Sequence, residues 1–110
     1  MKRRDLPETG EELRQLSQHM RVARRRRRMT LRALAERTGV SVATLSRLER
    51  ADPTVAIGTV LQVLSVLGLA KGFSRFVSPE NDIEQTLQEV RELRRTKRDL
   101  PHFTDEELDF

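Results

Sequence analysis

The stretch that most constrains the fold runs from Leu31 to Arg50 and reads LRALAERTGVSVATLSRLER. A small residue at Ala35 allows a second helix to cross close by, and Gly39 can take the positive φ that ends a helix without a Cβ penalty. Ser41 is then placed to cap the next helix. Aliphatic residues stand at helical spacings around these positions, at Leu34, Val40, Leu45 and Leu48. These spacings predict two short helices joined by a sharp turn.

The second of these helices has an outer face of short polar side chains and arginine. If the aliphatic residues point inward, this face comprises Ser41, Val42, Ala43, Thr44, Ser46, Arg47 and Arg50. A helix of this kind lies in the major groove when a helix-turn-helix binds DNA, and its N-terminal side chains contact base edges. The pattern therefore indicates a DNA-binding helix-turn-helix, the alternative being an ordinary helical hairpin with a glycine turn.

Positive charge is concentrated around this motif. Residues 21 to 50 hold ten arginines against Glu36 and Glu49, a net charge of +8, whereas residues 76 to 110 have a net charge of −5. A polyanion suits the first segment and is repelled by the second.

Five successive arginines, at positions 24 to 28, directly precede the motif. They wind around a helix, so only some of them can face one partner. One interpretation is a solvated basic face. We favour phosphate contacts from the residues nearest the motif, which are Arg27, Arg28, Thr30 and Arg32.

Hydrophobic spacing predicts the remaining helices. After a mobile arm at residues 1 to 8, Thr9 and Glu12 form a capping box that begins a helix running to about Arg27. Residues 57 to 67 predict a fourth helix with Ile57, Val60, Leu61, Leu64 and Leu67 as its main stripe, followed by Gly68, and a short fifth helix closes the core with Phe73, Phe76 and Val77. We therefore expect an all-α fold, a five-helix DNA-binding domain over residues 9 to 77.

The central part of the chain resembles a known protein family. Residues 16 to 77 look like the Xre/Cro family of phage-repressor-type, lambda-repressor-like DNA-binding domains, a five-helix bundle whose second and third helices form the helix-turn-helix. The stretch GVSVATLSRLERADPTVAIGTVLQVLSVLGL, from Gly39 to Leu69, is similar to small antitoxin repressors encoded beside HipA-type protein kinase toxins. The resemblance implies a transcriptional repressor that represses its own toxin-antitoxin operon and binds a HipA-type kinase toxin. A stand-alone Xre-family regulator is the alternative, because the loop Asp52 to Val55 also suits a solitary protein.

Three positions depart from the family pattern. Leu31 stands where many members have a glutamine that contacts DNA, so Thr30 or Arg32 would take that role. Val42 stands where many have a polar residue, and it can offer only apolar contact to a thymine methyl. Ala56 stands where a serine commonly caps the fourth helix.

Two other classes of protein fit the sequence poorly. An enzyme lacks support because there is no glycine-rich phosphate loop, no HExxH and no cysteine, and His19 and His102 are the only imidazoles. We therefore expect no catalytic residues, no metal ligands and no cofactor. A non-specific nucleic-acid-binding protein that uses only the arginine run is the other alternative, but four phenylalanines with no tyrosine or tryptophan give little for base stacking.

The C-terminal residues 78 to 110 predict a further helix and an acidic tail. A helix from Asn81 to Arg98 would place Ile83, Leu87 and Val90 on one side, before a break at Pro101. Residues 99 to 110 are acidic without lysine or arginine, which suits a basic-rimmed groove on a protein partner or a fold-back onto the arginine run. The apolar anchors for a partner would be Leu100, Phe103, Leu108 and Phe110.

The expected repressor function predicts how the protein assembles, and the apolar pattern of the chain predicts where it is located. A repressor of this type is expected to be a homodimer on an inverted-repeat operator of double-stranded DNA, with half-sites about 34 to 36 Å apart. Polar residues and glycines interrupt the longest apolar stretch, Val55 to Ala70, so it is not a membrane span. No apolar run follows the basic N-terminus, which predicts a cytoplasmic protein.

Overall fold

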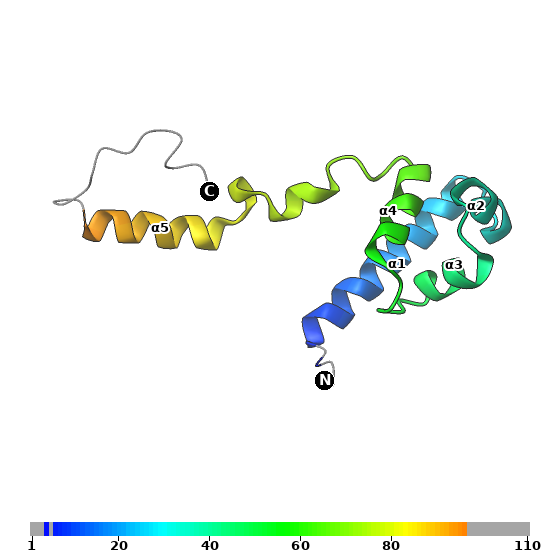
Figure 1. The fold of residues 1–110 in the computed structure, drawn as a ribbon, viewed down its shortest axis with the longest axis horizontal. Coiled ribbons are helices and arrows are strands. Elements are labelled where there is room, and N and C mark those ends of the chain that lie inside the picture. The colour runs from blue at the N-terminus through cyan, green and yellow to red at the C-terminus, as the bar shows by residue number, and fades with distance from the viewer. Residues whose placement is uncertain (1–3, 5, 97–110) are drawn as a thin grey trace. The chain divides into compact units, whose positions relative to one another are not determined.

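The computed structural model describes residue 4 and residues 6–96 of the chain, and these residues form helices and turns without strands. In order, the elements are α1 (Pro7–Arg26), α2 (Leu31–Thr38), α3 (Val42–Glu49), α4 (Ile57–Val66), the short 3-10 helices η1 (Phe73–Val77) and η2 (Pro79–Asn81), and α5 (Ile83–Arg95) (Figure 1). The predicted all-α fold with a helix-turn-helix is confirmed. The chain divides between Lys71 and Gly72 into two compact units.

The core of the first unit lies where α2 packs on α3 and α4 and where α1 packs on α3. The predicted inward positions Leu34, Leu45 and Leu48 are confirmed, since each exposes at most 2% of its surface. Ile57 was expected in the buried stripe of α4, but it is 63% exposed. It is the first residue of the helix and precedes the turns that pack against the bundle. The other buried apolar residues are Met20, Ala23, Val60, Val63, Leu64 and Leu67.

The ends of α2 and α3 follow the predicted capping. Thr30 Oγ1 accepts a hydrogen bond from the Ala33 N–H, and Ser41 Oγ accepts one from the Thr44 N–H. Gly39 has φ +74°, which lets the chain turn sharply between the two helices. These caps satisfy N–H groups that have no partner within their own helix, so they fix where each helix begins.

The start of α1 differs from the prediction. The helix begins at Pro7, two residues before the expected cap at Thr9, and no side chain caps it. Proline suits the first helical position because its φ is already helical and its missing N–H would have no partner there. The predicted capping box of Thr9 and Glu12 is therefore wrong, and both residues lie within the helix.

The second unit contains η1, η2 and α5. Phe73 and Phe76 form an edge-to-face pair with ring centroids 5.8 Å apart, but Phe76 is 76% exposed and Val77 is 84% exposed. The expectation that this segment closes the core remains a prediction, because η1 belongs to the second unit and the core to the first. The predicted C-terminal helix is confirmed as α5, which Asp82 caps. The proposed anchors Leu100, Phe103, Leu108 and Phe110 lie outside the described residues.

Within residues 6–96, none of the helices combines the length and the apolar character that crossing a membrane requires.

Candidate DNA interface

The helix α3 is divided into a buried side and an outer side. Leu45 and Leu48 are buried in the core, whereas the start of the helix is open to solvent. Of the residues predicted on the outer face of this helix, Ser41, Val42, Ala43 and Arg50 are exposed, and Thr44, Ser46 and Arg47 are partly exposed. The structure thus brings the seven predicted residues onto or beside one surface of a single eight-residue helix.

Polar side chains on this outer side are paired with one another. The Ser41 hydroxyl donates to Thr44 Oγ1 at 2.9 Å, and Arg50 Nη1 donates to Ser46 Oγ at 2.6 Å. Such exposed hydrogen bonds are worth little net free energy, because water can replace either partner. They can therefore be exchanged for base edges or phosphates without a large cost.

Arg47 is held by the loop that follows α3. Its Nε donates to Asp52 Oδ2 at 2.8 Å and its Nη2 donates to the Thr54 hydroxyl at 2.6 Å. Asp52 Oδ1 in turn accepts the Thr54 N–H and hydroxyl. Hydrogen bonds from Thr54 and Arg47 hold the pKa of Asp52 well below its usual range, so the carboxylate is charged at neutral pH.

This network occupies only part of the Arg47 guanidinium. An arginine has five N–H donors in a planar fork, and the loop receives two of them. The loop therefore limits the rotamers of Arg47 while leaving donors free for an acceptor outside the chain.

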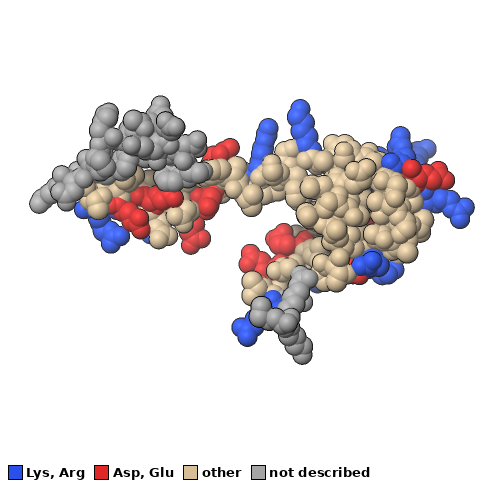
Figure 2. Space-filling model, in the orientation of Figure 1, with Lys and Arg blue, Asp and Glu red and all other residues tan. Residues whose placement is uncertain are grey.

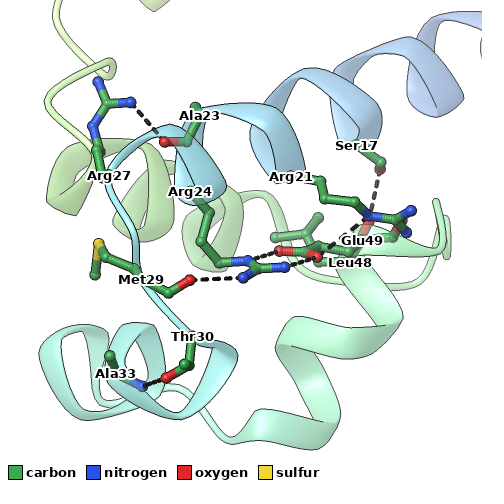
Figure 3. Close-up of polar contacts among 10 residues, drawn as sticks. All are labelled: Ser17, Arg21, Ala23, Arg24, Arg27, Met29, Thr30, Ala33, Leu48 and Glu49. Carbon is green, nitrogen blue, oxygen red and sulfur yellow. Dashed lines mark hydrogen bonds and ion pairs between the residues drawn. The ribbon is translucent and has the colours of Figure 1, made fainter.

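A nearly buried ion pair joins α1 to the C-terminal end of α3. Arg24 Nε donates to Glu49 Oε2 at 2.7 Å and Arg24 Nη2 donates to Glu49 Oε1 at 3.0 Å (Figure 3). The two side chains are 10% and 9% exposed. Arg24 Nη1 also donates to the Met29 carbonyl at 2.7 Å. Hydrogen bonding to Glu49 raises the pKa of Arg24 above its ordinary value, which keeps the guanidinium charged despite burial.

Two further side chains of α1 bind the last carbonyls of α3. The buried Ser17 hydroxyl donates to the Leu48 carbonyl at 2.7 Å, and Arg21 Nη2 donates to the Glu49 carbonyl at 2.9 Å (Figure 3). Carbonyls in the last turn of a helix lack partners within the helix and carry partial negative charge, so hydroxyl and guanidinium donors stabilise them. Together with Arg24, these contacts fix the direction of α3 on the long helix α1.

The junction between α1 and α2 contains a residue in an unusual conformation. Arg28 has φ +54°, its N–H donates to the Arg25 carbonyl, and the Met29 N–H donates to the Arg24 carbonyl. This is a Schellman motif, in which the left-handed position is usually glycine. Ala51 has φ +61° in the equivalent turn after α3. Relative to glycine, a side chain at either position lowers the free energy of unfolding by about 1 kcal/mol.

The four predicted phosphate contacts lie around this junction. Arg27, Arg28, Thr30 and Arg32 are all exposed. Arg27 Nη1 donates to the Ala23 carbonyl at 2.7 Å, and in Figure 3 its side chain extends away from α3. Figure 2 shows basic side chains around the end of the first unit where α2 lies.

The sequence prediction missed the supports of α3. Arg24 was counted with the basic run, although a spacing of four from Met20 places it on the buried side of α1. Ser17 lies three residues before Met20 on that same side. A polar residue at core spacing is the signal that would have identified both. The departure at Ala56 stands, because no side chain caps α4.

Among residue 4 and residues 6–96, no cluster of three or more histidine, aspartate or glutamate side chains is placed to hold a metal ion.

Comparison with known proteins agrees with this geometry. No curated protein and no solved structure matches the chain. A family model described as a helix-turn-helix domain matches residues 15–72, which is more than half of the 110 residues and includes α2, the turn at Gly39 and α3. The chain therefore belongs to this helix-turn-helix domain family.

Proposed function

We propose that this protein is a sequence-specific, DNA-binding transcriptional repressor of the Xre type that acts as a homodimer on an inverted repeat. The observation that carries the proposal is the exposure of Ser41, Val42 and Ala43 at the start of α3 while Leu45 and Leu48 of the same helix are buried. The first turn of a recognition helix reaches base edges when the helix enters the major groove.

The roles of the individual residues follow from their chemistry. Arg47 can pair with guanine O6 and N7, Val42 and Ala43 can contact thymine methyl groups, and Ser41, Thr44 and Ser46 can exchange hydrogen bonds with bases. Arg27, Arg28, Thr30, Arg32 and Arg50 suit backbone phosphates. The left-handed conformation of Arg28 supports this assignment, because residues held in costly conformations cluster at functional sites.

The test is selection of binding sites from a random duplex library with the full chain. We expect an enriched inverted repeat whose half-sites lie about one helical turn apart. Binding to the selected duplex should exceed binding to a scrambled duplex by a factor of at least about 10³. Equal affinity for both duplexes would contradict the proposal and favour the non-specific alternative.

We further propose that the protein is the antitoxin of a toxin-antitoxin operon, that it represses this operon, and that it binds a HipA-type kinase toxin. The support is the resemblance of residues 39 to 69 to such antitoxins, together with the acidic and apolar composition of residues 99 to 110. A short segment of this composition suits a groove with basic edges.

Deletion of residues 99 to 110 separates the possible roles of the tail. If the tail binds a partner, operator affinity stays constant while binding to the product of the neighbouring gene falls. Tighter DNA binding with unchanged partner binding would instead show that the tail folds back on the basic run. If the product of the neighbouring gene does not bind the full chain, the protein is a stand-alone regulator and the antitoxin proposal is wrong.

A further inference from the structure

The helix α5 carries an apolar stripe that the other described residues of its unit, within 72–96, leave exposed. Ile83, Leu87 and Val90, spaced by four and three residues, lie on one side of the helix and are 66%, 50% and 38% exposed. No residue of α5 is buried, and within the described residues its main contacts are with the short η2. A helix of 13 residues is only marginally stable in water by itself, so this stripe calls for an apolar partner.

The charges of α5 and its cap are unevenly distributed along the helix. Asp82 and Glu84 are the charged side chains at its N-terminal end, whereas its second half carries Arg91, Arg94 and Arg95 together with Glu89 and Glu92. Figure 2 shows acidic side chains along much of the helix and basic ones toward its C-terminal end. A partner that complements this helix must have the opposite order of charges.

A second copy of α5 has that order when it runs antiparallel. We propose that α5 is a self-association helix that pairs with α5 of a second copy of this chain in an antiparallel, coiled-coil-like arrangement. Leu87 would then pack against Val90 of the other copy, and Ile83 would pack against the aliphatic stem of its Arg94. This arrangement extends the proposed homodimer by naming its interface.

The residues beside the stripe favour this direction. Glu84 and Arg91 each follow a stripe residue, are seven positions apart and therefore lie on the same flank of the helix. In an antiparallel pair, Glu84 of each copy lies near Arg91 of the other, so two ion pairs form. In a parallel pair, Arg94 would instead face Arg94, and Glu84 would lie at the same level as Glu84, which places like charges together.

The expected dimer is weak when it is free in solution. A helix of 13 residues is about 20 Å long, so the interface between the two α5 helices contains few layers of apolar side chains. When both copies bind one inverted repeat, the DNA holds them close together and so strengthens this weak interface. The self-association of the free chain should therefore depend on concentration in a range that sedimentation can measure.

The test is sedimentation velocity of the full chain, without DNA, over a range of concentrations. We expect reversible dimers, and we expect Leu87→Asp to weaken dimerisation at least tenfold. Gln88→Asp is the matched control, because it adds the same charge to an exposed position beside the stripe and should change the association much less. A chain that remains monomeric, or equal effects of the two substitutions, would overturn the proposal.

Charge reversal tests the antiparallel direction. Glu84→Arg and Arg91→Glu should each weaken dimerisation by about fivefold, since each places like charges together twice per dimer. The double variant should restore the original affinity. If it remains as weak as the single variants, the antiparallel arrangement is wrong. Circular dichroism of each variant establishes that the first unit is folded. Because these measurements contain no DNA, they succeed or fail independently of the proposed repressor function.

Discussion

The Nε atom of Arg47 lies 2.8 Å from Asp52 Oδ2, so the loop after the proposed recognition helix holds the side chain best suited to a guanine edge. Restricting a long side chain before binding lowers the entropy lost when it meets DNA. The Asp52 carboxylate also repels phosphate, which disfavours contacts in which Arg47 would bind the backbone without regard to sequence.

Arg47→Ala should therefore reduce discrimination between the selected operator and a scrambled duplex by about 5- to 150-fold, as expected for loss of a bidentate guanine contact. Asp52→Ala should reduce it less, because the guanidinium remains but is no longer oriented. Fluorescence anisotropy with both duplexes measures the ratio. Lys71→Ala, which removes an exposed charge outside α3, serves as the control. An unchanged ratio for Arg47→Ala would show that this residue does not read sequence.

The same loop predicts a pH dependence of stability. The pKa of Asp52 is lowered in the folded protein, whereas the pKa of an aspartate in an unfolded chain is about 3.9. The carboxylate therefore contributes stability above the unfolded pKa and loses this contribution as the pH falls through the folded pKa. We expect wild type to have a higher Tm than Asp52→Asn at pH 7 and this difference to shrink below about pH 4. A difference that stays constant into strong acid would show that the charge is not responsible.

The ion pair between Arg24 and Glu49 predicts a large loss of stability. Arg24→Met leaves the Glu49 carboxylate nearly buried without its main partner, which should lower the free energy of unfolding by about 3 kcal/mol. Urea denaturation measures this change. Arg25→Met is the matched control, since Arg25 is exposed and the change should be within about 0.5 kcal/mol. The double variant Arg24→Met, Glu49→Leu should be more stable than Arg24→Met alone. If the two arginine variants are equally stable, the ion pair does not secure α3.

Local patterns predicted most of the first unit because the deciding interactions are close in sequence. Thr30, Gly39 and Ser41 act on backbone groups within four residues, so their types and positions are sufficient to place the ends of α2 and α3. The spacing of Leu34, Leu45 and Leu48 likewise gives the buried side of each helix. At the start of α1, by contrast, two local signals competed, and Pro7 prevailed over the capping box at Thr9.

The main omission concerns an interaction between distant residues. Arg24 and Glu49 are 25 positions apart in the sequence. Because Arg24 belongs to a run of five arginines, the sequence alone did not show that it is the one that faces inward. The role of Phe76 and Val77 in closing the core remains a prediction, since these residues follow Gly72 and belong to the second unit. The predicted DNA contacts remain predictions, because exposure on α3 is necessary for binding but does not identify the bases.

The conformation of Arg28 gives a prediction that separates stability from DNA binding. Glycine adopts φ +54° without the penalty of a Cβ, so Arg28→Gly should raise the free energy of unfolding by about 0.5 to 1 kcal/mol. If the side chain contacts a phosphate, the same change should weaken binding to every duplex and reduce the slope of log K against log salt by about 0.9. Ala51→Gly is the matched control, because it relieves the same strain at φ +61° without removing a charge, and it should stabilise the protein while leaving the salt slope unchanged. Equal DNA binding by both variants would mean that Arg28 adopts its strained conformation for a reason other than phosphate contact, and a loss confined to one DNA sequence would assign it to base recognition instead.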